Sequence, residues 1–172
     1  MAAHFEFARL AAQYHASGRF AALSHYLPVA GNLLHHSIEM FLKCVLVKAL
    51  TLKELKGLGH NLATLWSRFA QIHPYPTHAA LTAAVAELER FERLRYPDSV
   101  VLEGMQVSFV ISRSQYRPLP AGPQPPYHLV LEDVDCIAKI AAQASGLDRA
   151  AFTAGLSEQA IQFLEFHNVH PL

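Results

Sequence analysis

The chain has 172 residues, of which 52% are hydrophobic and only 16% are charged, and its 14 basic and 14 acidic residues cancel. This length suits one domain with a sizeable core, and a net charge of zero provides no overall field that would indicate nucleic-acid binding. The excess of apolar residues predicts that a second copy of the chain covers part of the surface, so we expect a homodimer.

The chain shows no pattern for export or membrane insertion. Charged residues interrupt its N-terminal segment, which therefore lacks the apolar core of a signal peptide. The apolar run at 38–50 contains Lys43 and Lys48 and is too short to cross a bilayer. The two cysteines, Cys44 and Cys136, lie in helical apolar patterns that are typical of buried, reduced thiols. We therefore expect a cytoplasmic protein.

The first two helical patterns in chain order cover residues 3–26 and 28–50. The first has apolar residues at helical spacing, and we expect Gly18 to break it into two pieces. Pro28 suits the first turn of the second helix. This second segment is apolar on nearly every side, which is typical of a helix in the middle of a bundle.

The polar residues of the 28–50 segment form one narrow line. They are spaced three and four apart, and they are Asn32, His35 or His36, Glu39 and Lys43. Glu39 precedes Lys43 by four residues, which is the favourable order for an ion pair within a helix. Because an unpaired buried charge is costly, this line must be paired internally or must lead to a solvated groove.

A short connector and two further core helices follow. Thr51 and Glu54 have the spacing of a capping box for a short helix. Asn61 can cap the third core helix, expected over 61–73, and the fourth is expected over 77–95. Apolar residues recur three and four apart in both segments, so each helix has one face for the core.

The periodicity changes in the next segment. Residues 100–112 are rich in β-branched and aromatic residues, which favour strands. The proline-rich segment 117–126 is a loop. Residues 127–131 form a short strand candidate that can pair back on 106–112. We therefore expect a small hairpin-like β insertion around 100–131.

The last core helix is expected over 132–145, and Gly146 ends it. Short helices over 147–167 complete the chain. The sequence thus predicts one all-α domain spanning residues 1–172, an antiparallel bundle of four or five helices with the β insertion described above.

Four short motifs occur in a particular order along the chain. They are Ser37-Ile38-Glu39, Lys43 on the same helix, Gly59-His60-Asn61-Leu62, and Arg95-Tyr96-Pro97. In this order they resemble the pattern of HEPN domains, over roughly residues 28–98, and the helix at 132–145 fits the same layout. The resemblance implies a helical bundle that dimerises through a helix-rich face. Many HEPN proteins act in toxin–antitoxin or antiviral systems, or beside minimal nucleotidyltransferases, so an antitoxin or a nucleotidyltransferase is an expected partner.

Catalytic HEPN proteins are metal-independent ribonucleases. Their motif is an Arg, four to six residues and then a His on the last core helix, which corresponds to about 113–140 here. Arg113, Arg117 and His128 lie in that region, but the gaps between them do not fit the motif. The resemblance therefore implies a member without the usual ribonuclease motif.

Arg68 and His73 do have the ribonuclease spacing, but they lie on the predicted 61–73 helix. An arginine can hold a scissile phosphate and a histidine can move a proton, so this pair is the alternative catalytic site. Phe69 replaces the expected polar residue after the arginine, however, and Pro74 follows the histidine. The competing interpretation is a solvated arginine and a histidine at a helix end.

The preferred candidates for ligand binding are Glu39, Lys43, His60, Arg93, Arg95 and Tyr96. In the HEPN layout, the start of the 61–73 helix brings His60 to the polar line, and Arg93 and Arg95 lie close by. A helix start with a histidine and neighbouring arginines suits a phosphate or a nucleotide. The competing interpretation is a structural polar network that fixes the register of the helices.

A metal site is a weaker interpretation of the same region. His35 and Glu39 lie one turn apart beside His36, and His60 adds a ligand only if its loop folds back. A closed metal site needs about four ligands. We therefore expect no metal and no cofactor, and we expect Glu39 to pair with Lys43 and to accept a hydrogen bond from a histidine.

The sequence as a whole predicts a non-catalytic HEPN-like protein that binds a partner protein, RNA or a nucleotide. Two alternatives are a metal-independent HEPN endoribonuclease and a purely structural dimeric scaffold.

Overall fold

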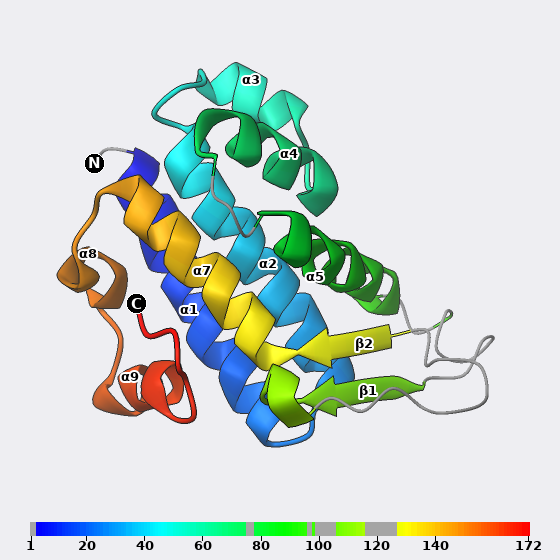
Figure 1. Cartoon of the computed structure of the whole chain (residues 1–172). Coiled ribbons are helices and arrows are strands. Elements are labelled where there is room, and N and C mark those ends of the chain that lie inside the picture. Colours follow the sequence, from blue (N-terminus) through cyan, green and yellow to red (C-terminus); the bar gives the residue numbers. More distant parts are fainter. Residues whose placement is uncertain (1–2, 75–77, 96–97, 99–105, 116–126) are drawn as a thin grey trace.

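The computed structural model describes residues 3–74, 78–95, 98, 106–115 and 127–172, except for the side chains of His78 and Arg95. Within these ranges the fold is all-α apart from two short strands, which confirms the predicted fold class (Figure 1). None of the described helices combines the length and the apolar character that a membrane crossing requires.

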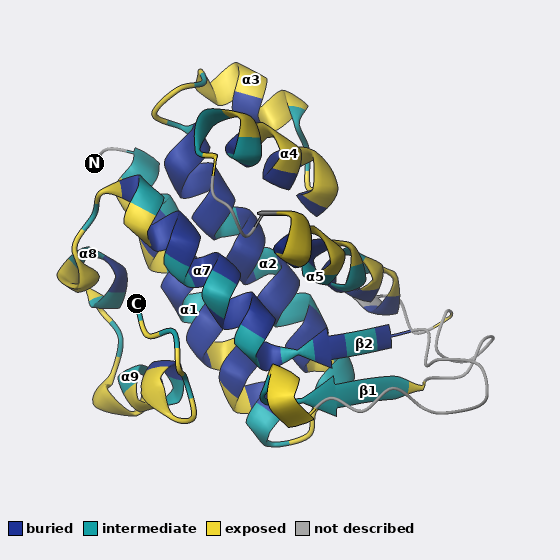
Figure 2. Ribbon diagram, viewed as in Figure 1, coloured by how far each residue is buried: buried dark blue, intermediate teal, exposed yellow. Residues whose placement is uncertain are grey.

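The centre of the fold is α2 (Leu27–Leu46), as its pattern predicts. It contacts α1 (Ala3–Leu23), α4 (Leu62–Ile72), the 3-10 helix η1 (Phe91–Arg95) and α7 (Leu131–Ser145). Buried residues run along most of α2 and α7 (Figure 2). The fully buried apolar side chains of α2 include Leu34, Ile38, Phe41, Leu42 and Leu46. Each such side chain contributes roughly 1.5–3 kcal/mol by leaving water, so the burial of α2 contributes strongly to core stability.

The helices around α2 run in both directions. α1 is antiparallel to α2, because a tight turn joins the two helices (Figure 1). α7 runs in the same direction as α2, and the ammonium of Lys48, just beyond α2, donates to the carbonyl of Ser145 at the end of α7. α5 (His78–Arg90) packs on α4 and contacts α2 as well, so the two helices form a second layer.

The shorter helices are α3 (Leu52–Gly57), α8 (Arg149–Thr153) and α9 (Glu158–Glu165). The last two agree with the short helices predicted near the C-terminus. α2 ends at Leu46, four residues before the predicted end at 50, and α5 gives way to η1 at Phe91.

The structure confirms the helix ends that the capping residues predict. Thr51 and Glu54 form the capping box of α3, with each side chain bonded to the other residue's backbone N–H. The Oδ1 of Asn61 accepts from the Thr64 N–H at 2.7 Å and caps α4. Gly146 ends α7 with a φ of 67°, a conformation that a glycine adopts without steric cost.

The predicted break at Gly18 is wrong, because α1 continues through it to Leu23. A Cβ atom at this position would lie 2.7 Å from Cγ of Leu34 on α2. The glycine therefore lets α1 and α2 approach each other closely, and this packing outweighs the low helix propensity of glycine.

The predicted hairpin is also wrong, because β1 (Val107–Val110) and β2 (Tyr127–Val130) pair in parallel, from Val107 with Tyr127 to Val110 with Val130. A tight turn allows only antiparallel pairing, whereas a connection of about a dozen residues or more allows parallel pairing. Residues 111–126 separate the two strands in the sequence, which is long enough for parallel pairing. β2 leads directly into α7, so the direction of α7 also sets the direction of the strand. The remainder of the predicted insertion, at 100–105 and 116–126, lies outside the described residues.

Candidate ligand-binding site

The polar line of α2 converges on Glu39, whose side chain is fully buried. The Nζ of Lys43 donates to Oε1 of Glu39 at 2.6 Å, as the spacing predicts. The Nδ1 of His60 lies 2.8 Å from the same oxygen, and the Nδ1 of His36 lies 3.4 Å from Oε2. Burial by itself raises the pKa of Glu39, but the hydrogen bonds from His36, Lys43 and His60 and the charge of Lys43 outweigh it and lower this pKa to about 2.

Local structure brings His60 to Glu39. Gly59 has a φ of 67° and turns the chain after α3, so that His60 faces α2 just before α4 begins. Asn61 then caps α4, and Glu89 of α5 accepts from the Leu62 N–H at 2.5 Å. The Asn61 cap and the Glu89 carboxylate therefore both fix the start of α4, and this fixes the position of the neighbouring His60.

A pocket of about 310 Å³ opens beside this cluster. Its lining residues are Phe7, Lys43, Leu52, Leu55, Lys56, Gly59 and His60. Lys43 is only 10% exposed, whereas Lys56 is exposed and the side chain of His60 is 77% exposed. Two ammonium groups and an imidazole thus face a partly apolar cavity. This arrangement is suited to a ligand with an anionic group and an apolar part.

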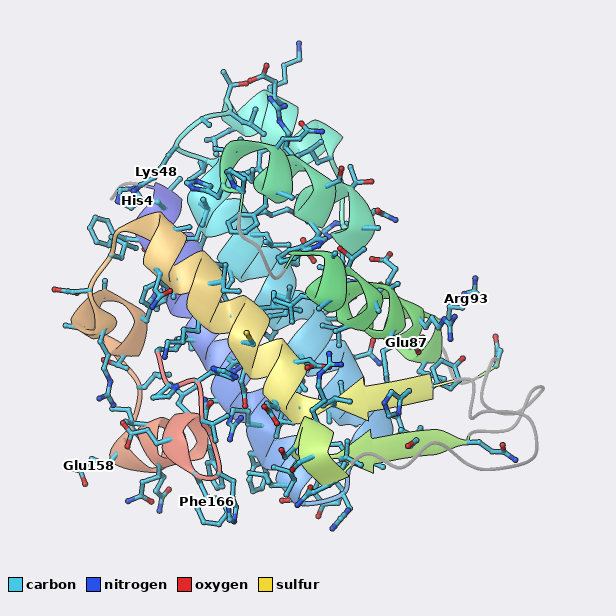
Figure 3. The ribbon with its side chains drawn as sticks, viewed as in Figure 1. His4, Lys48, Glu87, Arg93, Glu158 and Phe166 are labelled. Carbon is cyan, nitrogen blue, oxygen red and sulfur yellow. The ribbon has the colours of Figure 1, made fainter. Side chains whose placement is uncertain are left out.

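The structure does not bring Arg93 into this cluster. Phe91, two residues earlier in η1, packs where a Cβ of Gly31 would lie. Gly31 precedes Glu39 by eight residues, or about 12 Å along the helix axis. Arg93 is exposed and points away from the body of the protein (Figure 3). The side chain of Arg95, and Tyr96 as a whole, lie outside the described residues.

Arg68 and His73, the alternative catalytic pair, contact different residues. The Nη1 of Arg68 donates to Oε1 of Gln71 at 2.9 Å on the exposed face of α4. His73 is the residue that ends α4, and its ring packs 5.4 Å from the ring of Phe69. Arg68 lines a shallow surface pocket of which His73 is not part. The described geometry thus places the two side chains in separate environments.

Arg113 and His128 come together although their spacing in the sequence does not match the ribonuclease motif. Both line a pocket of about 270 Å³, together with Glu87 and Asp133. Arg113 forms two 2.8 Å bonds to the carboxylate of Asp133. Burial, the largest cause, lowers the pKa of His128, which leaves the ring mainly neutral at pH 7. Two carboxylates beside one guanidinium do not favour the phosphate of an RNA.

A Ser–His–Asp arrangement that sequence reasoning missed lies between α1, α2 and α7. The Nδ1 of His15 lies 3.1 Å from Oγ of Ser37, and its Nε2 lies 2.9 Å from Oδ1 of Asp135. Arg19 pairs with the other oxygen of Asp135 and donates to the carbonyl of Phe163 at 2.6 Å. All four polar side chains are at most 2% exposed, so no substrate reaches them. The arrangement therefore joins helices and does not form an active site.

A second cluster lies on the other side of His36. His35 is fully buried, and neither of its ring nitrogens has a hydrogen-bond partner among the described residues. Its Nε2 and Nδ1 lie 3.7 Å from carboxylate oxygens of Glu89 and Glu92, respectively. Burial, the largest cause, lowers the pKa of His35. Donor atoms of His35, His36 and Glu92 lie within 4.8 Å of one another, so Glu92, and not the expected Glu39, is the carboxylate that completes this group.

The structure thus brings Glu39, Lys43 and His60 together and separates them from Arg93. Lys56 was missed, although its place in the short helix between Lys43 and His60 is visible in the sequence. Comparisons with protein-family models, with curated proteins and with solved structures found no match. The HEPN resemblance accordingly depends on the four sequence motifs alone.

Proposed function

We propose that this chain is a non-catalytic HEPN-like protein that binds a phosphate-bearing ligand, either RNA or a nucleotide. The observation that carries the proposal is the pocket in which Lys43, Lys56 and His60 face a partly apolar wall.

The charges around the pocket support an anionic ligand. Glu39 is the one carboxylate bonded to this cluster among the described residues, and Lys43 neutralises it. The ammonium of Lys43 has three N–H donors, so the bond to Glu39 leaves donors for a ligand. Lys56 adds a second positive charge on the exposed side. A phosphate at this position replaces water at donors that are already in place.

The apolar wall supports a ligand that is more than a free phosphate. Leu52 is 61% exposed beside the pocket, and Phe7 and Leu55 form part of the lining. A nucleobase packs well on such a surface, because its flat faces lose little on leaving water. The pocket offers one histidine and no Arg–His pair, which supports binding and not cleavage.

We also propose that the protein is a cytoplasmic homodimer. The resemblance alone implies an antitoxin or a nucleotidyltransferase as its partner. Large apolar side chains are exposed on the described surface, among them Phe20 at 44% and Phe166 at 56%. A groove of about 660 Å³ between α1 and α9 includes Phe20. The two free cysteines suit a reducing compartment. Sedimentation of a single 19.1 kDa species at micromolar concentration would contradict the dimer.

The test of the binding proposal compares two lysines of the same short helix. Lys56→Ala removes a charge from the pocket, whereas Lys53→Ala removes an exposed charge that is not part of the lining. We expect the first variant to weaken binding of labelled single-stranded RNA or of a nucleotide by about tenfold, or about 1.4 kcal/mol. We expect the control to weaken it by less than about twofold and binding to weaken with salt.

The same assay separates the alternatives. Equal losses for the two lysine variants, or no binding of either ligand, would overturn the proposal and favour the scaffold. Cleavage of the RNA in the presence of a chelator, abolished by His73→Ala, would establish the endoribonuclease instead. Binding of the RNA without competition by mononucleotides would identify the ligand as RNA.

A further inference from the structure

The two nitrogens of the buried His35 ring lie too far from the nearest carboxylate oxygens to form hydrogen bonds. Its side chain is 0% exposed, yet both nitrogens lie 3.7 Å from the nearest carboxylate oxygens of Glu89 and Glu92. Hydrogen bonds between nitrogen and oxygen span about 2.7–3.2 Å. Leaving a buried imidazole unbonded costs about 1–3 kcal/mol, so an atom that bridges one of these gaps would stabilise the fold.

The distances match those around a metal ion. Zinc binds nitrogen and carboxylate oxygen at about 2.1 Å, which puts two ligand atoms of a tetrahedral site about 3.4 Å apart. The Nδ1 of His35 and Oε2 of Glu92 are 3.7 Å apart, within a few tenths of an ångström of that value. Ligand atoms of His35, His36 and Glu92 all lie within 4.8 Å of one another, and the His36 ring is 24% exposed.

The contacts of His35 and His36 with other carboxylates also fit a metal site. Histidines that bind a metal through one nitrogen usually donate from the other to a carboxylate, which orients the ring. The Nε2 of His35 faces Glu89, which the Leu62 N–H holds at 2.5 Å. The Nδ1 of His36 faces the buried carboxylate of Glu39. Each ring therefore has one nitrogen directed toward a carboxylate outside the proposed ligand set, at 3.7 Å for His35 and at 3.4 Å for His36.

We propose that His35, His36 and Glu92 bind a divalent transition-metal ion of the zinc type, and that Glu89 and Glu39 orient the two rings. Two imidazoles and one carboxylate form a set of ligands that zinc binds well, with water in the fourth position. Because His36 and Glu92 are 24% and 30% exposed, the ion has a route from solvent.

The test is a titration of the tag-free, chelator-treated chain with Co²⁺, followed by absorption in the visible range and by competition with Zn²⁺. We expect one ion per chain and the intense bands of a four-coordinate site. His36→Ala and Glu92→Gln each remove a ligand at a partly exposed position and are expected to weaken binding by more than about 100-fold. Glu89→Gln is expected to weaken it by about 10–100-fold, because this residue orients His35.

Matched controls are His73→Ala, at the C-terminal cap of α4, and Glu87→Gln on α5. They remove the same groups elsewhere and are expected to leave the affinity for Co²⁺ unchanged. Circular dichroism and melting of each variant establish that it folds. Absence of bands at a hundredfold excess of Co²⁺ would overturn the proposal, and so would an affinity that His36→Ala and Glu92→Gln do not change. Lys56→Ala is expected to bind Co²⁺ normally, so failure of the pocket proposal and failure of this one are distinguishable.

Discussion

Two polar clusters that each include residues of α2 have similar compositions and different access to solvent. The sealed network consists of His15, Arg19, Ser37 and Asp135, and the open line consists of His35, His36, Glu39, Lys43 and His60. Both ring nitrogens of His15 have partners, whereas those of His35 have none among the described residues. The open line also reaches the surface, because the side chain of His60 is 77% exposed. Histidines and carboxylates therefore hold helices together where they are enclosed, and they are available to a ligand only where the packing leaves a path to solvent.

The largest effect is expected from breaking the sealed network. Asp135→Ala leaves Arg19 and His15 buried without their carboxylate, and removing one partner of a buried ion pair typically costs about 3–5 kcal/mol. Urea unfolding followed by circular dichroism measures the free energy of unfolding, with Asp98→Ala, at an exposed position, as the control. A loss below about 1 kcal/mol would mean that this network does not hold α1 to α7.

Removing the centre of the open line is expected to cost less. Glu39→Gln leaves Lys43 without its partner, but Lys43 lies at the edge of a pocket and can turn to water, so we expect a loss of about 2 kcal/mol at pH 7. The free energy of unfolding of the wild type should also depend on pH through this residue. The pKa of Glu39 is lowered from 4.5 to about 2, so its contribution is complete above pH 4.5 and is lost as the pH falls toward 2.

Unfolding measured from pH 6 to pH 2 tests the assignment. Below pH 4.5 the free energy of unfolding should fall less for Glu39→Gln than for the wild type. An identical decline in both proteins would assign the acid sensitivity to other carboxylates.

An effect of comparable size is expected from separating η1 from α2. A Cβ at Gly31 would lie 1.8 Å from Cδ1 of Phe91, so Gly31→Ala displaces this ring and is expected to cost about 1–3 kcal/mol. It should also move Glu92 and weaken the proposed metal site, without affecting the sealed network. Gly57→Ala is the matched control, because nothing lies within 4 Å of its Cβ position. Equal melting temperatures for the two variants would contradict the close approach of η1.

The smallest effect on stability is expected at the exposed end of the open line. His60→Ala removes one hydrogen bond to Glu39 from a mostly exposed side chain, so we expect a loss of less than about 1 kcal/mol. Binding of the nucleotide or RNA should nevertheless weaken, because the imidazole lines the pocket. A variant that is strongly destabilised would place His60 among the structural residues and remove it from the site.

The candidate site could be predicted in part. The bond between Glu39 and Lys43 follows from their spacing on one helix. The approach of His60 to Glu39 is expected from the HEPN layout alone, and the structure has the two side chains 2.8 Å apart. The family layout predicts Arg93 beside this site, whereas the structure puts it elsewhere, because the packing of Phe91 on Gly31 positions η1. No local pattern could have paired His35 with Glu89 and Glu92, which lie on other elements.

The sequence by itself determined the features that depend on neighbouring residues. It determined the all-α class, the central position of α2, the caps at Thr51 and Asn61, and the end of α7 at Gly146. These features follow from hydrogen bonds and spacings within a few residues. Only the tertiary structure decided that α1 passes through Gly18, that the strands are parallel, and that His15 meets Asp135. Each of these depends on contacts between distant segments, whose packing energies outweigh the local preferences of the chain.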